Sequence, residues 1–156
     1  MSKLYDVAVV GATGLVGETV LSILEQREFP VASLYLLASE RSVGQKIMYD
    51  GKNLSVENIQ DFDFSQAQIA LFCAGGSISE TYAPIAADSG CVVIDNSSFF
   101  RNEFDVPLVV PEVNPDSIIN YSARNIIANP NCSTIQMMLA LAPIHREVGI
   151  EKINVS

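Results

Sequence analysis

Residues 5–17 read YDVAVVGATGLVG: a short valine-rich run is followed directly by three glycines in the spacing GxxGxxG. Apolar residues at Val16, Val20 and Leu24 then recur with the period of an amphipathic helix. This order of strand, tight turn and helix is typical of a dinucleotide-binding domain, where glycines let the backbone approach a pyrophosphate at the helix N-terminus. Glycines also serve close packing of a helix on a strand, so the spacing alone leaves both roles open.

Strands and helices alternate along the chain, which predicts an α/β fold with a Rossmann-type, doubly wound and mainly parallel sheet. The dipeptide Asp50-Gly51 between two alternating runs predicts a β-hairpin inserted at residues 45–57. The other elements expected in this region are a strand at 69–72, a helix at 79–89 and a strand at 91–94.

Ligands of open α/β sheets collect at the carboxyl ends of the strands. Four segments of this chain follow predicted strands: the glycine loop, a small-residue loop at Gly75, the turn at 95–98 and the turn that precedes Cys132. We therefore expect all four segments to face one crevice.

The residues after the second predicted strand indicate which dinucleotide is bound. NAD sites usually carry an acidic residue about 20 residues past the glycines, where it accepts the ribose 2′-hydroxyl. Here the chain has Ser39, Glu40, Arg41 and Ser42. A guanidinium and two hydroxyls suit a 2′-phosphate, which favours NADP. This interpretation requires Glu40 to point to solvent while Arg41 faces the ligand; the alternative is that Arg41 is an ordinary surface charge.

Residues 129–134 (NPNCST) form a predicted turn that places Cys132 at the start of an apolar helical stretch, 135–148. Unpaired backbone N–H groups and the positive end of the helix dipole favour a thiolate over a thiol at such a position. A nucleophile beside a hydride carrier indicates thioester chemistry. The alternative is a buried structural cysteine, the more common role of this residue type.

Composition restricts the class of protein. The chain is 49% hydrophobic and 17% charged, and its 156 residues suit one domain with a sizeable core. The net charge of −9 argues against nucleic acids and anionic membranes as partners. Cys73, Cys91 and Cys132 form no CxxC pair, so neither a disulfide framework nor a zinc or other metal site is indicated. No signal peptide precedes the first strand and no apolar run reaches the roughly 20 residues that span a bilayer, so we expect a cytoplasmic protein.

Six stretches together resemble aspartate-semialdehyde dehydrogenase, and they are spread over nearly the whole chain. They are GATGLVG at 11–17, ASERSVG at 38–44, CAGGS at 73–77, DNSSFFR at 95–101, VPEVN at 110–114 and NPNCSTIQMM at 129–138. The related N-acetyl-glutamyl-phosphate reductases typically carry NPGCY around their cysteine. This chain instead has Asn131 before Cys132 and Ser133 after it.

The resemblance implies conversion of L-aspartyl 4-phosphate and NADPH into L-aspartate 4-semialdehyde, phosphate and NADP, in the pathway to lysine, threonine and methionine. It makes Cys132 the nucleophile that forms a thioester and Arg101 a phosphate or substrate ligand, with Asn96 and Asn131 as neighbours. The cofactor-binding residues that it implies are Gly11, Thr13, Gly14, Leu15, Val16, Gly17, Ser39, Arg41, Ser42 and Gly75. The alternative role for Arg101 is a surface salt bridge with Glu103 or Asp105.

One expected part is missing from this sequence. Thiol chemistry of this kind needs an acid/base group, but the one histidine, His145, comes 13 residues after Cys132 on the same predicted helix, about 20 Å away. We expect residues 1–128 to form the NADP-binding domain and residues 129–156 to carry the cysteine turn, its helix and the start of a strand at 150–155. The resemblance implies that a second α+β domain follows, which supplies the base and most of the interface of a homodimer or homotetramer. The 156 residues look like an amino-terminal portion of such a protein.

Two classes of function remain open from the sequence. One is the cofactor-and-nucleophile part of this dehydrogenase, or of a related acyl-phosphate reductase. The other is a non-catalytic NADP-binding or redox-sensing module, in which Cys132 is only an accessible thiol.

Overall fold

The computed structural model describes residues 3–155, and its centre is a seven-stranded sheet in the order β3-β4-β2-β1-β5-β6-β7. The strands are β1 Tyr5–Val10, β2 Val31–Ala38, β3 Lys46–Tyr49, β4 Lys52–Asn58, β5 Ile69–Phe72, β6 Val92–Asp95 and β7 Ile126–Ala128. The β3–β4 pair is antiparallel and the other neighbouring pairs are parallel. In chain order the parallel strands are arranged 3-2-1-4-5-6, which is the strand order of dinucleotide-binding sheets. The predicted doubly wound α/β sheet is confirmed.

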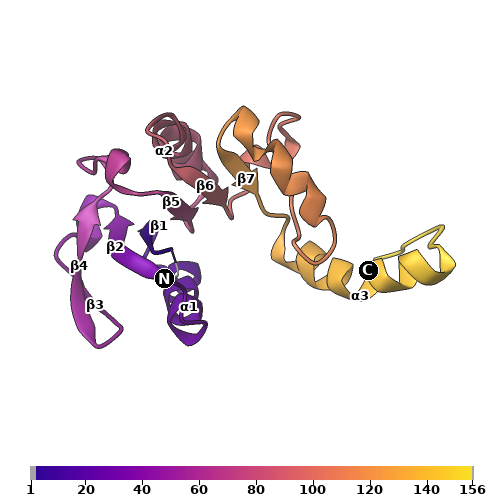
Figure 1. The fold of residues 1–156 in the computed structure, drawn as a ribbon, viewed down its shortest axis with the longest axis horizontal. Helices are drawn as coiled ribbons and strands as arrows, with labels where there is room; N and C mark the ends of the chain where they lie inside the picture. Colours follow the sequence, from indigo (N-terminus) through magenta and orange to yellow (C-terminus); the bar gives the residue numbers. More distant parts are fainter. Residues whose placement is uncertain (1–2, 156) are drawn as a thin grey trace.

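Helices α1 (Leu15–Gln26) and α2 (Gly76–Asp88) cover opposite faces of this sheet (Figure 1). They do so because β1-α1-β2 and β5-α2-β6 are crossovers of the same hand that leave the centre of the sheet in opposite directions. β1 accordingly divides its side chains between two cores. Val7 and Val9 pack on the α1 side, and Ala8 and Val10 pack on the α2 side.

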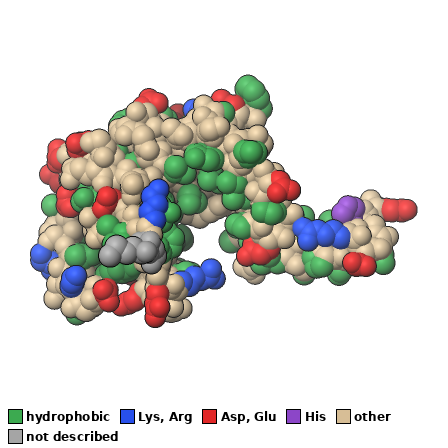
Figure 2. Space-filling view, in the orientation of Figure 1, with side chains coloured by type: hydrophobic (Ala, Val, Ile, Leu, Met, Phe, Trp, Pro, Cys, Tyr) green, Lys and Arg blue, Asp and Glu red, His purple; other side chains and the backbone are tan. Residues whose placement is uncertain are grey.

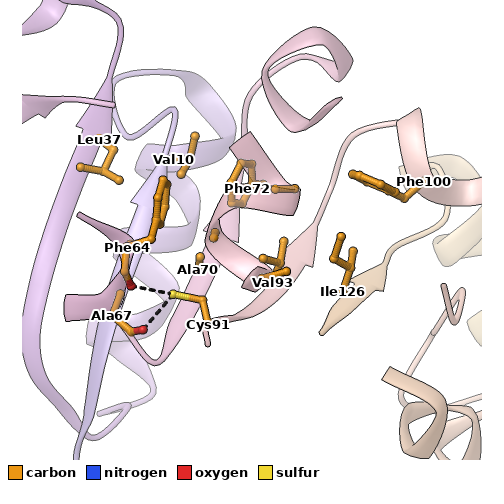
Figure 3. Close-up of a cluster of buried hydrophobic side chains, with 14 of the residues drawn as sticks. Val10, Leu37, Phe64, Ala67, Ala70, Phe72, Cys91, Val93, Phe100 and Ile126 are labelled. Atoms are coloured by element: carbon orange, nitrogen blue, oxygen red, sulfur yellow. Dashed lines mark hydrogen bonds between the residues drawn. The ribbon is translucent and has the colours of Figure 1, made fainter. Parts of the chain in front are cut away.

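The core on the α2 side is drawn in Figure 3. Phe72, Val93 and Ile126 come from three neighbouring strands and are each at most 1% exposed. Cys91 lies at the edge of this cluster, where its thiol donates to the carbonyl oxygens of Phe64 at 3.1 Å and Ala67 at 2.8 Å (Figure 3). Cys91 is therefore a structural residue of the core.

The hairpin predicted at residues 45–57 is confirmed, and Asp50 and Gly51 at its tip both have positive φ, 47° and 71°. The hairpin is more than an insertion, however. Its second strand, β4, also pairs in parallel with β2, with Val56 opposite Leu36. Burial of Val56 makes this pairing favourable, so the hairpin extends the main sheet and replaces a crossover helix.

Two predicted elements need correction. Helix α2 begins at Gly76, three residues before the predicted start at 79, because Gly75 has extended backbone and serves as the N-cap. The strand predicted at 150–155 is absent, since among residues 3–155 no strand lies beside this segment to form a ladder. Its first amide, Ile150 N, instead donates to His145 Nδ1 at 3.0 Å.

The connection from β6 to β7 contains two 3-10 helices, η3 (Phe99–Asn102) and η4 (Pro115–Ala123). Between them, the chain runs along the outer side of β7. There Val109 N donates to Ala128 O and Ala128 N donates to Pro107 O, both at 2.9 Å. These bonds cover part of the edge that β7 would otherwise expose.

Helix α3 (Cys132–Val148) projects away from the sheet (Figure 1), and the space-filling view shows it as an arm beside the body (Figure 2). Ala142 is its one buried residue among those described. Arg146 ties the helix to the body by donating to Val113 O at 2.8 Å. Within residues 3–155, no helix combines the length and the apolar character that crossing a membrane requires.

We predict that Gly17→Ala destabilises the chain. A Cβ at this position would lie 2.8 Å from Ala12 Cα and 2.9 Å from Gly11 C, both backbone atoms that cannot move independently of the glycine loop. Overpacking of this kind costs about 1–3 kcal/mol in the free energy of unfolding, measured by urea denaturation. Gly76→Ala is the matched control, because its Cβ would meet Phe99 Cβ at an ordinary 3.8 Å. Equal stability of the two variants would contradict the prediction.

Candidate functional site

A cavity of about 270 Å³ lies at the carboxyl ends of β1, β2 and β5. It is lined by Val10, Gly11, Thr13, Gly14, Ala38, Ser39, Ile59, Cys73, Ala74 and Ile78. Chain connections leave β1 and β5 in opposite directions, and the gap between such strands is where doubly wound sheets bind ligands. The cavity therefore lies where a dinucleotide is expected.

The structure shows the packing role of the glycine loop directly. Gly11 has a φ of 81° and passes so close to β5 that a Cβ there would lie 3.0 Å from Cys73 C. Gly17 is buried against the loop backbone, as described above. Gly14 is exposed and is the N-cap of α1, so the first N–H groups of the helix have no partner within the helix. Close packing at Gly11 and Gly17 thus fixes the conformation of the loop. The unpartnered N–H groups after Gly14 are suited to binding an anion.

Leu15 and Val16, the first two residues of α1, are 82% and 50% exposed. Both were predicted to contact the cofactor. Apolar side chains with this exposure beside a glycine loop are available to cover a ligand, and Leu15 is more exposed than most apolar side chains of the chain.

The loop after β2 joins the glycine loop at one side-chain contact, in which Thr13 Oγ1 and Ser42 Oγ lie 3.2 Å apart. Arg41 is exposed in the 3-10 turn η1 (Glu40–Ser42) between Ser39 and Ser42. The ion pairs formed within residues 3–155 both involve Arg124, so Glu40 does not neutralise Arg41. Of the three residues predicted for a 2′-phosphate, Ser39 lines the cavity, Ser42 contacts the cavity-lining Thr13, and Arg41 lies between them in the chain.

A second cluster follows β6 and β7 on the same edge of the sheet, and half-buried Arg101 is its centre. Arg101 Nε donates to Asn129 O at 2.8 Å, and Arg101 Nη2 donates to Asn96 O at 3.0 Å. The side chains of Asn129 and Asn96 also bond to each other, with Asn129 Nδ2 as donor. Glu103 and Asp105 pair with Arg124 at 3.9 and 3.4 Å, so the salt-bridge alternative for Arg101 is wrong.

Cys132 is the first residue of α3, three residues before the predicted apolar stretch, and it is exposed. Asn131 is the N-cap, and its Oδ1 accepts from Ser133 N at 2.9 Å. This bond fixes the turn that delivers the thiol. The alternative of a buried structural cysteine does not apply to Cys132.

His145 lies in the last turn of α3, where its Nδ1 accepts the Ile150 amide. Thirteen residues of helix separate it from Cys132, about 20 Å along the axis. This histidine caps the end of the helix and is out of proton-transfer reach of the thiol.

Asn96 connects the two parts of the site. Its Nδ2 donates to Phe72 O at 2.9 Å and approaches Cys73 Sγ at 3.8 Å, and Cys73 lines the cavity. Gly75 lies at the end of the same β5 loop, exposed, with open space where a Cβ would stand. These residues follow one edge of the sheet, but the expected single crevice is seen only in part, since the lining of the cavity includes the glycine loop and the β5 loop and none of residues 95–98 or 129–132. Asn129 and Cys73 were missed as site residues, although Asn129 opens the NPNC motif and Cys73 directly follows a predicted strand.

Comparison with known proteins gives the family. Residues 6–121 match the family model described as semialdehyde dehydrogenase, NAD binding domain. The chain belongs to this semialdehyde dehydrogenase family. The family match covers the glycine loop, the loop after β2, Asn96 and Arg101, and it ends at residue 121, before Asn129 and Cys132. The resemblance inferred from the six motifs is confirmed.

Relatives of this chain carry a more specific name. Aspartate-semialdehyde dehydrogenase 2 of Vibrio cholerae serotype O1 is 60% identical over 156 residues, which are 100% of this chain and 46% of the relative. The crystal structure of aspartate semialdehyde dehydrogenase II complexed with ASA from Vibrio cholerae has a TM-score of 0.94 at 60% identity, over 96% of this chain and 49% of that one. The enzyme with NADP from Candida albicans has a TM-score of 0.79 at 24% identity, over 95% and 48% of the two chains, a likeness of fold alone. The chain spans about half the length of the curated relatives it matches.

We predict that iodoacetamide at neutral pH labels Cys132 at least about tenfold faster than Cys73 or Cys91, because alkylation requires an accessible thiolate. Burial raises the pKa of Cys73 to about 11 and that of Cys91 to about 11, whereas Cys132 is exposed at a helix start. Peptide mapping by mass spectrometry measures the three rates. In urea the three rates should become similar, which shows that the fold causes the difference. Slower labelling of Cys132 in the folded chain would count against an activated nucleophile.

Proposed function

We propose that this chain carries the cofactor-binding and nucleophile-bearing part of an NADP-dependent aspartate-semialdehyde dehydrogenase. The observation that carries the proposal is an exposed Cys132 at a helix start, on the same sheet edge as a cavity at the position where doubly wound sheets bind dinucleotides. The name of the relatives that are 60% identical supports the choice of substrate. The reaction is reductive dephosphorylation of L-aspartyl 4-phosphate to L-aspartate 4-semialdehyde.

The residues around the cavity fit NADP. The glycine loop and the first turn of α1 would hold the pyrophosphate, since Gly14 leaves the backbone accessible there. Arg41, Ser39 and Ser42 would hold the 2′-phosphate, because a guanidinium and hydroxyl groups are good phosphate donors. When bound, the nicotinamide supplies a hydride to the acyl carbon attached to Cys132.

Cys132 Sγ would attack the acyl carbon of the substrate, and phosphate would leave as the thioester bond forms. The first turn of α3 aids this step, because its N–H groups and dipole stabilise negative charge near the thiol. After reduction the thiol leaves and the aldehyde is released. The proton acceptor for the thiol is not His145, and we expect it in the part of the relatives' length that this chain does not span.

Arg101 would hold the phosphate of the substrate. The guanidinium has five N–H donors, and two of them bond to the Asn96 and Asn129 carbonyls, which leaves three for an anion. Those two bonds also fix the plane of the guanidinium. Asn96, whose carbonyl oxygen accepts from Arg101, and Asn131, the N-cap of the cysteine helix, are the further substrate contacts that we propose.

The proposed chemistry requires a reduced thiol at Cys132. Reduced cysteines persist in the cytoplasm and are oxidised in secreted proteins, so we propose a cytoplasmic location.

We predict that the full-length gene product oxidises aspartate semialdehyde in a phosphate-dependent way, measured by NADPH absorbance. Cys132→Ser should nearly abolish this turnover, because an alcohol without an adjacent strong base is a poor nucleophile. The 156 residues alone should bind NADP at best weakly and show no steady-state turnover, since their one histidine lies about 20 Å from Cys132 along α3. Turnover of N-acetyl-glutamyl phosphate in place of aspartyl phosphate would identify the related reductase. Absence of turnover with either substrate, combined with tight NADP binding, would indicate a non-catalytic module.

We predict that Arg41→Ala weakens NADP binding by about 1.5–3 kcal/mol, the contribution of a charge-assisted hydrogen bond, and leaves NAD binding unchanged. Isothermal titration calorimetry measures both affinities. Arg27→Ala is the matched control, because Arg27 is also an exposed arginine but lies at the C-cap of α1, remote from the cavity. Equal affinities of the unmutated chain for NADP and NAD would refute the cofactor assignment.

A further inference from the structure

A buried carboxylate lies between the two parts of the site and takes no part in the steps above. Asp95, the last residue of β6, is 0% exposed. Its Oδ1 accepts from Ser79 Oγ at 2.7 Å and from Ser97 N at 3.1 Å, and its Oδ2 accepts from Ser97 Oγ at 2.7 Å. These donors are neutral, and the ion pairs formed within residues 3–155 involve Arg124 instead. A buried carboxylate without a cation is costly, so its hydrogen bonds must hold it firmly.

The side chain of Asp95 bonds to a residue that directly follows the lining of the cavity. Ser79 lies in the first turn of α2, and its amide bonds to Gly75 O at 3.3 Å. The chain just before Ser79 lines the cavity through Cys73, Ala74 and Ile78. The Asp95–Ser79 bond therefore fixes the start of α2, and with it one wall of the cavity, against the end of β6.

The backbone of Asp95 holds the nucleophile turn. Asp95 O accepts from Asn129 N at 2.9 Å, and Asn129 is three residues before Cys132. The bonds from Ser97 to the carboxylate fix the turn that contains Asn96, which in turn bonds the Asn129 side chain. Asp95 thus contacts Ser79, the neighbour of the cavity-lining Ile78, and Asn129 in the turn that delivers the thiol.

We propose that Asp95 is a positioning residue, which sets the Cys132 turn relative to the cofactor cavity through Ser79 on one side and through Ser97 and Asn129 on the other. The effect on turnover rests on the proposed function, but the effect on structure does not. In a variant that lacks the Asp95 carboxylate, the cavity and the Cys132 turn would each still contain all of their other residues. What depends on Asp95 is the distance between the two parts, to which a two-centre reaction is sensitive.

The test is Asp95→Asn in the full-length gene product. Asparagine has the shape of aspartate, but its NH₂ group cannot accept the hydrogen bond that one carboxylate oxygen accepts now. We expect kcat to fall roughly 10- to 100-fold, because small displacements of reacting groups have effects of this size. We expect the Kd for NADP and the alkylation rate of Cys132 to change less than about twofold, since each part remains intact.

Ser79→Ala is the second variant, in case Asp95→Asn does not fold. It removes one hydrogen bond and leaves the carboxylate in place, so kcat should fall about three- to tenfold with the same unchanged NADP affinity. Asp63→Asn is the matched control. Asp63 also accepts an amide two residues on, from Ser65 N at 3.0 Å, but it is exposed and lies outside the site. Its kcat should equal that of the unmutated protein.

Unchanged kcat in both Asp95→Asn and Ser79→Ala, at a temperature where both are folded, would overturn the proposal. A loss of NADP affinity in proportion to kcat would also overturn it, since Asp95 would then act in binding. If the unmutated protein shows no turnover, the proposed function is wrong. The positioning role of Asp95 is then tested separately by hydrogen exchange. Ser79→Ala should then speed exchange in peptides covering both 76–82 and 129–133, whereas faster exchange confined to 76–82 would overturn the link.

Discussion

The position of β1 at the centre of the sheet determines where the other parts of the molecule lie. Val7, Val9 and Val10 are at most 1% exposed, and β1 pairs in parallel with β2 on one side and with β5 on the other. Crossovers of one hand must then carry the chain outward in opposite directions. The loops after β1 and β5 diverge, and the cavity opens between them. The Arg101 cluster lies further along the same edge because β6 and β7 continue the sheet outward in the same direction.

Short-range patterns in the sequence were sufficient for the parts of the fold that depend on neighbouring residues. The strand, glycine turn and helix at residues 5–26 and the hairpin at Asp50-Gly51 are as predicted. The parallel pairing of β4 with β2 was not predictable, because it depends on Val56 meeting Leu36 from a distant part of the chain. Residues 150–155 have the alternation of a strand but no neighbouring strand among the described residues, and alternation alone does not supply hydrogen-bond partners.

The candidate site divides in the same way. Thr13, Gly14 and Cys132 lie in local motifs whose spacing carries information: Thr13 and Gly14 line the cavity after β1, and Cys132 begins α3 as predicted. The bonds from Arg101 to Asn96 and Asn129 span 5 and 28 residues, and no spacing rule predicts them. Sequence proximity made Glu103 and Asp105 the alternative partners of Arg101. Both carboxylates pair with Arg124 instead. The Arg124 guanidinium also lies 5.4 Å from the centre of the Phe100 ring, a cation–π arrangement that stabilises this position.

Helix α3 makes the chain amphiphilic, because it carries exposed apolar side chains away from a charged body. Leu139, Ile144 and Val148 are 44%, 50% and 77% exposed on an arm that leaves an otherwise acidic body of net charge −9. Charge repulsion between bodies keeps copies of the chain apart at low ionic strength, while the apolar arms attract one another. Added salt screens the repulsion over about 10 Å at 0.1 M and leaves the apolar attraction in place. The colloidal stability of the chain therefore decreases as ionic strength rises, and glycerol or a mild detergent, rather than salt, will keep concentrated solutions clear.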